Sequence, residues 1–375
     1  MMRHGFRALV VLSSLLAVTL YLAAALPAAR GERPADAVEA ALLDQANRML
    51  DHAPVYAEPA GRSHIVLMPG FAWAVSLLMG VDHAQLWVIR QLALVATLVA
   101  TLLVFGIVRF ETGGWTLPLG AASLALLGPA LFGPQPGAAR PESIALLFVL
   151  LGFASLRFTI GVLGAIAAGV LLSIAFFVHA PAAWFIAAAA LSLAFEDRRR
   201  CTAFAIAALV LIGGGYVVLS MVLGPWFNFA AWDEPLRALG LAGGRAVRFA
   251  ADHLLGRLGV STLAVVMSCA ISTQPWHERR GIWMWLGAAS IIASLAGTSD
   301  GAAGVSLLAN IVTIGLVGAI ALDLVARHLA DSFGSAGHEG ESVIFAGVLL
   351  QFFLLVALSP APVWLGAAIG ALTGG

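Results

Sequence analysis

Apolar runs of close to 20 residues recur along the whole chain and constrain its fold more than any other feature. Hydrophobic residues make up 61% of the 375 residues and charged residues only 11%, whereas charge is about 25% in soluble globular proteins. Runs of this kind are typical of helices that cross a bilayer, where each helix pairs its own backbone polar groups. The sequence therefore predicts an all-α, polytopic helical membrane protein.

We expect about eleven transmembrane helices, at residues 7–29, 85–108, 115–132, 141–156, 161–178, 182–195, 202–224, 258–272, 281–296, 304–325 and 343–358. Arginines follow the expected cytoplasmic ends of these runs, as the positive-inside rule requires, most clearly in the arginine triplet 198–200. The chain is predicted to form a single integral membrane domain (1–375). Its parts are a first span (7–29), an outer loop with juxtamembrane helices (30–83), a block of spans (84–224), a second outer loop (225–257) and the remaining spans (258–375).

Two short or terminal runs leave alternatives open. The first run follows Arg3 and Arg7 and has the basic start of a signal peptide. Its length of nearly 20 residues exceeds the 7–15 residues of a signal-peptide core, which favours an uncleaved span with a cytoplasmic N-terminus. The run 65–80 is interrupted by Pro69 and Gly70, and we expect a re-entrant or interfacial helix there.

The first polar segment after the first span, 35–51, has the pattern of an amphipathic helix. One stripe at helical spacing is apolar, formed by Val38, Leu42, Ala46 and Met49. Asp44 and Arg48 lie on the opposite face with the spacing of a helical ion pair, whereas Glu39 lies along the apolar edge with Asp36 one turn before it. A carboxylate in an apolar cleft can act as a general base. Alternatively, both acids simply favour the start of a helix.

Arginines near the expected outer face are candidates for binding a phosphate. Arg90 opens a span and can bind a lipid phosphate or anchor the helix among headgroups. Arg140 precedes Pro141 and Glu142, which are typical of a helix start and leave the arginine free for a ligand.

The second outer loop is also basic. Arg245 and Arg248 lie three residues apart there, a pattern that suits either anionic lipid, including a polyprenyl phosphate, or headgroup anchoring. The sequence has equal numbers of basic and acidic residues, 20 of each, which makes nucleic acid an unfavourable partner. It contains no phosphate-loop, zinc-protease or CxxC motif, so no cofactor is assigned and a divalent cation is left open.

Several of these residues occur in one order along the chain, and this order resembles the GT-C superfamily of polytopic membrane glycosyltransferases. The nearest kinds are bacterial protein mannosyltransferases and aminoarabinose transferases. The resemblance covers about residues 7–235 and rests on VEAALLDQANRMLDHAPVY (38–56), MPGFAW (68–73), Arg90 and the Arg140-Pro141-Glu142 motif. Val38 and Ala40 depart from the family, in which a second acid and a glycine are frequent at these positions.

The resemblance implies a GT-C-like bundle and an inverting hexosyl or pentosyl transferase in the bacterial cytoplasmic membrane. Its donor would be a polyprenyl-phosphate sugar and its site would face outward, among membrane lipid. The implied site residues are Glu39 and Asp36 for catalysis, Arg90, Arg140, Arg245 and Arg248 for the donor phosphate, and Tyr56, His64, Pro69 and Glu142 for the substrate cleft. The alternative is a non-catalytic GT-C-like scaffold or lipid-carrier subunit of a membrane complex. A solute transporter is less favoured, because little charge lies at the depth of the bilayer centre.

Overall fold

The computed structural model describes residues 2–56, 67–79, 84–132, 135–229, 231, 247–271, 281–296, 308–333, 338–359, 364–366 and 368–369. Within these ranges all regular secondary structure is helical, which confirms the all-α expectation for the described part of the chain. The helices are α1 (Met2–Ala28), α2 (Ala37–Leu50), α3 (Pro69–Met79), α4 (Leu86–Thr112), α5 (Thr116–Phe132), α6 (Pro141–Phe158), α7 (Val162–Val178), η1 (Ala180–Ala182), α8 (Ala183–Glu196), α9 (Arg198–Leu223), α10 (Pro225–Asn228), η3 (Ala250–Arg257), α13 (Gly259–Ile271), α14 (Ile282–Ala296), α15 (Leu308–Phe333) and α16 (His338–Ala357).

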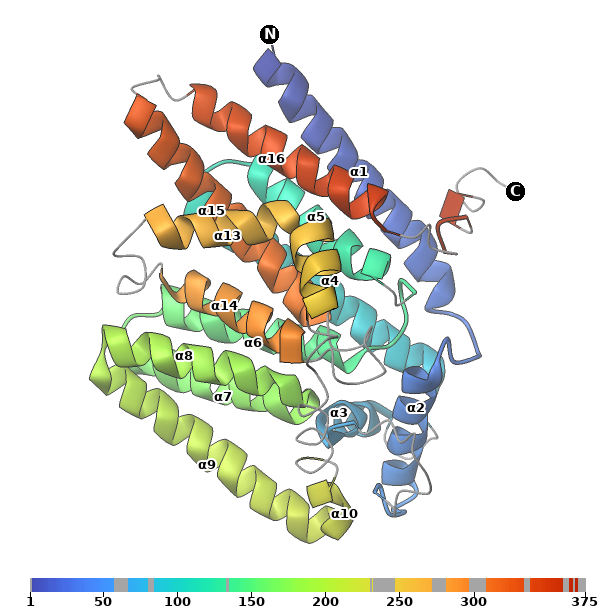
Figure 1. Ribbon diagram of the computed structural model, residues 1–375. Helices are drawn as coiled ribbons and strands as arrows, with labels where there is room; N and C mark the ends of the chain where they lie inside the picture. The colour runs from blue at the N-terminus through green and yellow to red at the C-terminus, as the bar shows by residue number, and fades with distance from the viewer. Residues whose placement is uncertain are drawn as a thin grey trace.

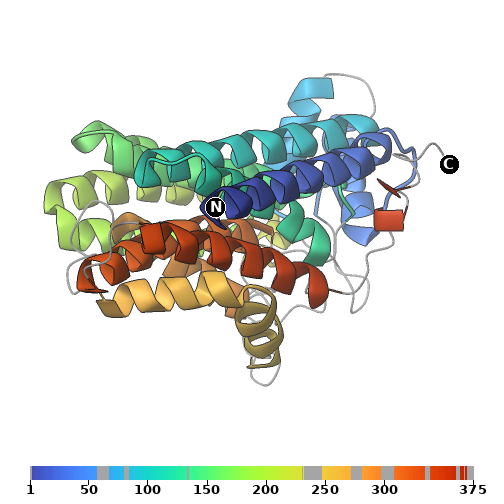
Figure 2. The ribbon, with the colours of Figure 1, turned by 90° about the horizontal axis from the view of Figure 1, so that it is seen from above.

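The long helices lie side by side along one general direction (Figures 1 and 2). α15 occupies the centre of the bundle, where it packs against α4, α5, α6, α13, α14 and α16. α9 lies at the edge and packs on α7 and α8. The short helices α2, α3 and α10 gather at one end of the bundle, and the turn between α8 and α9 lies at the other end (Figure 1).

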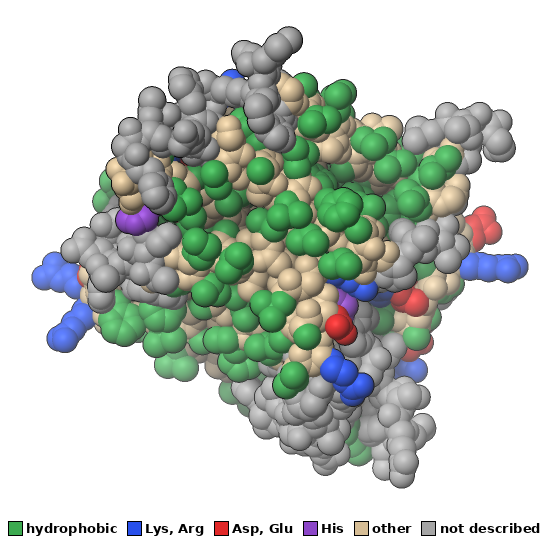
Figure 3. Space-filling model, turned by 45° about the horizontal axis from the view of Figure 1, so that its top comes forward, with side chains coloured by type: hydrophobic (Ala, Val, Ile, Leu, Met, Phe, Trp, Pro, Cys, Tyr) green, Lys and Arg blue, Asp and Glu red, His purple; other side chains and the backbone are tan. Residues whose placement is uncertain are grey.

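The surface of the bundle suits a membrane. Five of the described helices are long and apolar enough to cross a bilayer, and the bent pair η3–α13 adds a sixth if it is one span. In the apolar 18-residue stretch of α9, only 6% of the residues are buried inside the protein, whereas the share is 89% in α15. α9 therefore presents its side chains to lipid. Figure 3 shows hydrophobic side chains across the middle of one face and charged side chains toward opposite edges. The protein is thus a multi-pass membrane protein, and the number of eleven spans stays a prediction.

A buried polar cluster, the inner clamp, joins three helices at the predicted cytoplasmic end. Glu111 of α4 accepts hydrogen bonds from Arg157 of α6, at 2.6 Å from Nε and 3.2 Å from Nη2. The indole nitrogen of Trp283, on α14, donates to the same carboxylate at 3.0 Å. Since a buried carboxylate is costly unless it is paired, these contacts hold the ends of α4, α6 and α14 in register.

A buried glutamine bridges the sharp bend between η3 and α13. The two segments meet at an angle of 94°, and a break of this kind leaves backbone groups without helical partners. Gln351 of α16 donates from Nε2 to the carbonyl of Arg257 at 2.5 Å, and its Oε1 accepts from the backbone nitrogen of Ser261 at 3.0 Å. One side chain therefore satisfies both sides of the bend.

Candidate active site

The start of α2 places two carboxylates one turn apart. Asp36 is the N-cap: its backbone is extended (φ −157°), and its Oδ1 accepts from the backbone nitrogens of Val38 at 3.0 Å and Glu39 at 3.1 Å. Capping by aspartate satisfies N–H groups that have no partner within the helix. The cap sets the first turn of α2 and thereby directs Glu39 inward, on the apolar side that the sequence predicted. The predicted Asp44–Arg48 ion pair is confirmed on the exposed face, at 2.8 Å.

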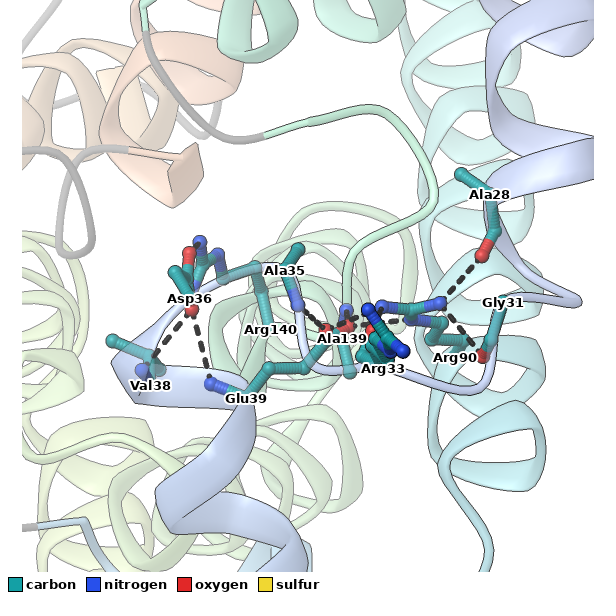
Figure 4. Close-up of polar contacts among 10 residues, drawn as sticks. All are labelled: Ala28, Gly31, Arg33, Ala35, Asp36, Val38, Glu39, Arg90, Ala139 and Arg140. Atoms are coloured by element: carbon teal, nitrogen blue, oxygen red, sulfur yellow. Dashed lines mark hydrogen bonds and ion pairs between the residues drawn. The ribbon is translucent and has the colours of Figure 1, made fainter.

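The Glu39 carboxylate is completely buried and accepts four hydrogen bonds (Figure 4). Oε1 accepts from Arg90 Nε at 2.8 Å and from the Ala139 nitrogen at 2.7 Å, whereas Oε2 accepts from Arg90 Nη2 and the Ala35 nitrogen, both at 2.7 Å. Burial opposes the charged form, but the hydrogen bonds from Arg90 and the two backbone nitrogens outweigh it, and the pKa of Glu39 lies below its ordinary value. Glu39 is therefore a fully coordinated anion.

Arg90 uses every N–H donor of its guanidinium within the protein. Besides its bonds to Glu39, Nη1 donates to the carbonyls of Ala28 at 2.6 Å and Gly31 at 3.0 Å, and Nη2 donates to the carbonyl of Arg33 at 2.8 Å. An arginine has five such donors, so none is left for a phosphate. A Cβ on Gly31 would lie 2.7 Å from Nη1, which explains the glycine there. Arg90 thus fastens the connection between α1 and α2 onto α4.

Asp36 and Arg140 form a second pair, beside the first but less enclosed (Figure 4). The guanidinium of Arg140 donates to both oxygens of Asp36, with Nη1 at 3.1 Å from Oδ1. The Asp36 side chain is 39% exposed, whereas that of Arg140 is 5% exposed and its buried Nε has no hydrogen-bond partner among the described residues. Burial opposes ionisation of Asp36, but hydrogen bonds from Arg140 and from the Glu39 nitrogen keep its pKa below the ordinary value.

Glu142 lies in the first turn of α6, two residues after Arg140. Its side chain is completely buried, and neither carboxylate oxygen has a hydrogen-bond partner in the described part of the chain. Arg140 also borders a cavity of about 30 Å³ with Tyr21 and Ser143, which has room for about one water molecule. The predicted Arg-Pro-Glu motif therefore places a cation, Arg140, and an acid without a described hydrogen-bond partner, Glu142, close to Asp36.

The other predicted cleft residues lie apart from these pairs or outside the described residues. Tyr56 donates to the carbonyl of Leu67 at 2.7 Å and accepts from Gln45 at 3.1 Å, so its hydroxyl contacts α2 six residues beyond Glu39. Pro69 opens α3 and is buried. Arg248 is exposed and lies two residues before the start of η3, in the first half of the bent pair. Residues 64 and 245, the predicted histidine and arginine, fall outside the described ranges.

Sequence reasoning missed the backbone partners of the site. The N–H groups of Ala35 and Ala139 carry no side-chain signal, yet they supply half of the hydrogen bonds to Glu39. Gly137 marks the turn that positions Ala139: its φ is +82°, and a Cβ there would lie 2.6 Å from the carbonyl oxygen of Ala25. A glycine in such a turn is the one signal that was available.

No group of three or more histidine, cysteine, aspartate or glutamate side chains among the described residues is arranged to hold a metal ion. Beside Asp36, the positive charge comes instead from the guanidinium of Arg140.

The bundle has a GT-C-like fold, which confirms the fold that the sequence resemblance implied. No protein-family profile and no curated relative matches the chain. Among solved structures, it is similar to the Archaeoglobus fulgidus oligosaccharyltransferase in its apo form, with a TM-score of 0.55 and 11% identity over 98% of this chain and 56% of that one. It is also similar to ArnT from Cupriavidus metallidurans bound to undecaprenyl phosphate, with a TM-score of 0.50 and 16% identity over 99% of this chain and 76% of that one. The chain thus spans little more than half the length of the oligosaccharyltransferase.

Proposed function

We propose that the protein is a membrane glycosyltransferase that moves a hexosyl or pentosyl group from a polyprenyl-phosphate donor to an acceptor. The reaction takes place at the outer face of the bacterial cytoplasmic membrane, and the N-terminus lies in the cytoplasm. The observation that carries the proposal is the half-exposed Asp36 carboxylate paired with Arg140 at one end of a GT-C-like bundle. The arginine-rich start of α9, expected to be cytoplasmic, lies at the opposite end.

In this reaction Asp36 is the general base. Its Oδ2 takes the proton of the acceptor nucleophile as the nucleophile attacks the anomeric carbon of the sugar. The bond from that carbon to the phosphate oxygen breaks on the opposite face, the electron pair leaves with the polyprenyl phosphate, and the anomeric configuration is inverted. The unpartnered Nε–H group of Arg140 stabilises the charge that develops on this phosphate.

Arg140 also couples the base to the leaving group. In the free protein its hydrogen bonds keep the pKa of Asp36 low, which makes the carboxylate a weak base. As the guanidinium turns toward the departing phosphate, these hydrogen bonds weaken and the basicity of Asp36 increases. The proton transfer is therefore favoured when a donor phosphate is present.

The geometry supports a positioning role for Glu39 and Arg90, in place of the catalytic and phosphate-binding roles expected from the sequence. A carboxylate has about four lone-pair positions, and all four are occupied in Glu39. Moving a proton onto Glu39 would break the pair with Arg90 and leave a buried charge unpaired. The pair instead holds the segment that carries Asp36 against the turn that carries Arg140.

The test is sugar transfer by the purified full chain in liposomes, with a panel of polyprenyl-phosphate sugars as donors. Asp36→Asn keeps a good N-cap, because asparagine caps helices about as well as aspartate. We expect this variant to fold and to lose about 10²–10⁴-fold in turnover, the usual contribution of a general base. The control is Asp44→Asn, an exposed acid on the same helix, which should keep wild-type turnover. Equal turnover in the two variants would remove Asp36 from the mechanism, and donor binding without turnover by the wild type would favour the scaffold alternative.

A further inference from the structure

A second cavity lies on the connection between α1 and α2, next to Arg90 of the Glu39–Arg90 pair. Its volume is about 580 Å³, and it is a depression that opens widely to the surface. Charged and polar lining comes from Arg30, Glu32, Arg33, Arg90 and, on the outer turn before α6, Gln135. Arg30 and Arg33, the two cationic residues of this connection, take no part in the proposed transfer reaction.

The charge that a ligand meets in this cavity comes from Arg30 and Arg33. Arg90 is neutralised by Glu39 and has no donor left. The side chains of Arg30 and Arg33 are exposed, and neither guanidinium has a hydrogen bond or an ion pair to any described residue. With Glu32 counted as the single opposing charge, the lining carries one net positive charge.

The backbone that carries these two arginines is held in place. The carbonyls of Gly31 and Arg33 both accept from Arg90, and the amide nitrogens of Arg30 and Gly31 bond back to the last turn of α1 at 3.1 and 3.0 Å. A fixed backbone reduces the entropy lost when a ligand binds. Since α1 is a candidate membrane span that ends at Ala28, the cavity follows directly on a membrane end, where lipid headgroups are found.

We propose that this cavity binds a phosphate group, with Arg30 and Arg33 as its two ligands. Planar guanidinium groups bind phosphate oxygens in pairs, which suits them to this role. The phosphate has two sources at this level of the membrane: the headgroup of an anionic phospholipid, or a free phosphate in the external solution. Asp36 and Arg140 are not among the residues that line this cavity, and the proposal does not depend on the transfer reaction.

The experiment measures lipid and phosphate binding by the full chain, without turnover. One arm reconstitutes the protein in phosphatidylcholine bilayers and compares spin-labelled phosphatidylglycerol with spin-labelled phosphatidylcholine at the protein surface. The other arm titrates inorganic phosphate into the protein in phosphatidylcholine nanodiscs by calorimetry. Both use the wild type, the double variant Arg30→Gln/Arg33→Gln, and the control Arg48→Gln, another arginine with an exposed side chain in the same outer segment.

For the lipid source, the wild type should select phosphatidylglycerol, and the double variant should lose about five-fold in selectivity for each arginine removed. For free phosphate, the titration should saturate in the wild type and be lost in the double variant, with lipid selectivity unchanged. Arg48→Gln should match the wild type in both arms. The proposal is overturned if the double variant matches the wild type in both, or if Arg48→Gln loses as much as the double variant. Because both side chains are exposed, the helical circular dichroism should be the same in all variants. Neither readout uses sugar transfer, so the phosphate-binding proposal can fail while the proposed role of Asp36 holds, and the reverse.

Discussion

Replacing Glu39 by glutamine is expected to lower the free energy of unfolding by about 3–5 kcal/mol. The carboxylate accepts four hydrogen bonds, two at each oxygen. Glutamine keeps one acceptor oxygen, and its NH₂ group faces two N–H donors where the second oxygen was. Arg90, only 4% exposed, then remains as a buried charge without its counter-ion, which is the change that carries a cost of this size.

The assay is reversible unfolding in mixed detergent–SDS micelles, followed by tryptophan fluorescence. Asp44→Asn is the matched control, because it breaks an ion pair on the same helix whose two side chains are 41% and 62% exposed. Exposed pairs of this kind contribute less than about 1 kcal/mol. A Glu39→Gln variant as stable as Asp44→Asn would refute the view that the buried pair fastens the outer segment.

The dependence of this effect on pH follows from the direction of the pKa shift. Since the pKa of Glu39 is lowered in the folded protein, its stabilisation is present above the pKa of the unfolded chain and is lost as the pH falls through the folded value. The stability of the wild type and of Glu39→Gln should therefore converge in acid. A difference that stays constant down to pH 3 would contradict the assignment of an ionised Glu39.

Three further predictions concern packing and use thermal or SDS unfolding. Gly137→Ala should cost about 1–3 kcal/mol because the new Cβ meets the carbonyl of Ala25, whereas Gly113→Ala, at a similar φ of +79° with open space around it, should cost less. Gln351→Ala should cost about 1–3 kcal/mol for each backbone group left unpaired at the bend between η3 and α13. Trp283→Phe should cost about 1.5–3 kcal/mol through the lost hydrogen bond in the inner clamp, and no loss would mean that water replaces the indole N–H.

Much of the fold could be predicted because hydropathy reports burial in lipid or in the core. The run predicted at 85–108 is α4, Leu86–Thr112, and the run at 161–178 is α7, Val162–Val178. The helices extend beyond the predicted apolar runs at their charged ends. α9 begins at Arg198, four residues before the predicted start, because Asp197 caps it with hydrogen bonds to two backbone nitrogens. Helix caps are set by hydrogen bonding, which an apolar count does not detect.

The candidate site was predictable as a set of residues but not as a set of pairs. Periodicity placed Glu39 on the buried side of its helix and Asp36 one turn before it, and both placements hold. Which arginine meets which acid depends on the turn before α6, since the nitrogen of Ala139 occupies one position on Glu39. Contacts between residues 100 positions apart, made by a backbone group, leave no pattern in a single sequence.

The two acid–arginine pairs differ in whether the carboxylate has a lone pair that a proton can reach. A general base needs a lone pair that a proton can reach and a partner that can be exchanged during the reaction. Glu39 has neither, because every lone pair is taken and Arg90 has no spare donor. Asp36 is 39% exposed, and its partner Arg140 keeps an unpaired Nε. In the reaction that we propose, the buried Glu39–Arg90 pair therefore supplies rigidity, and Asp36 beside it is the general base.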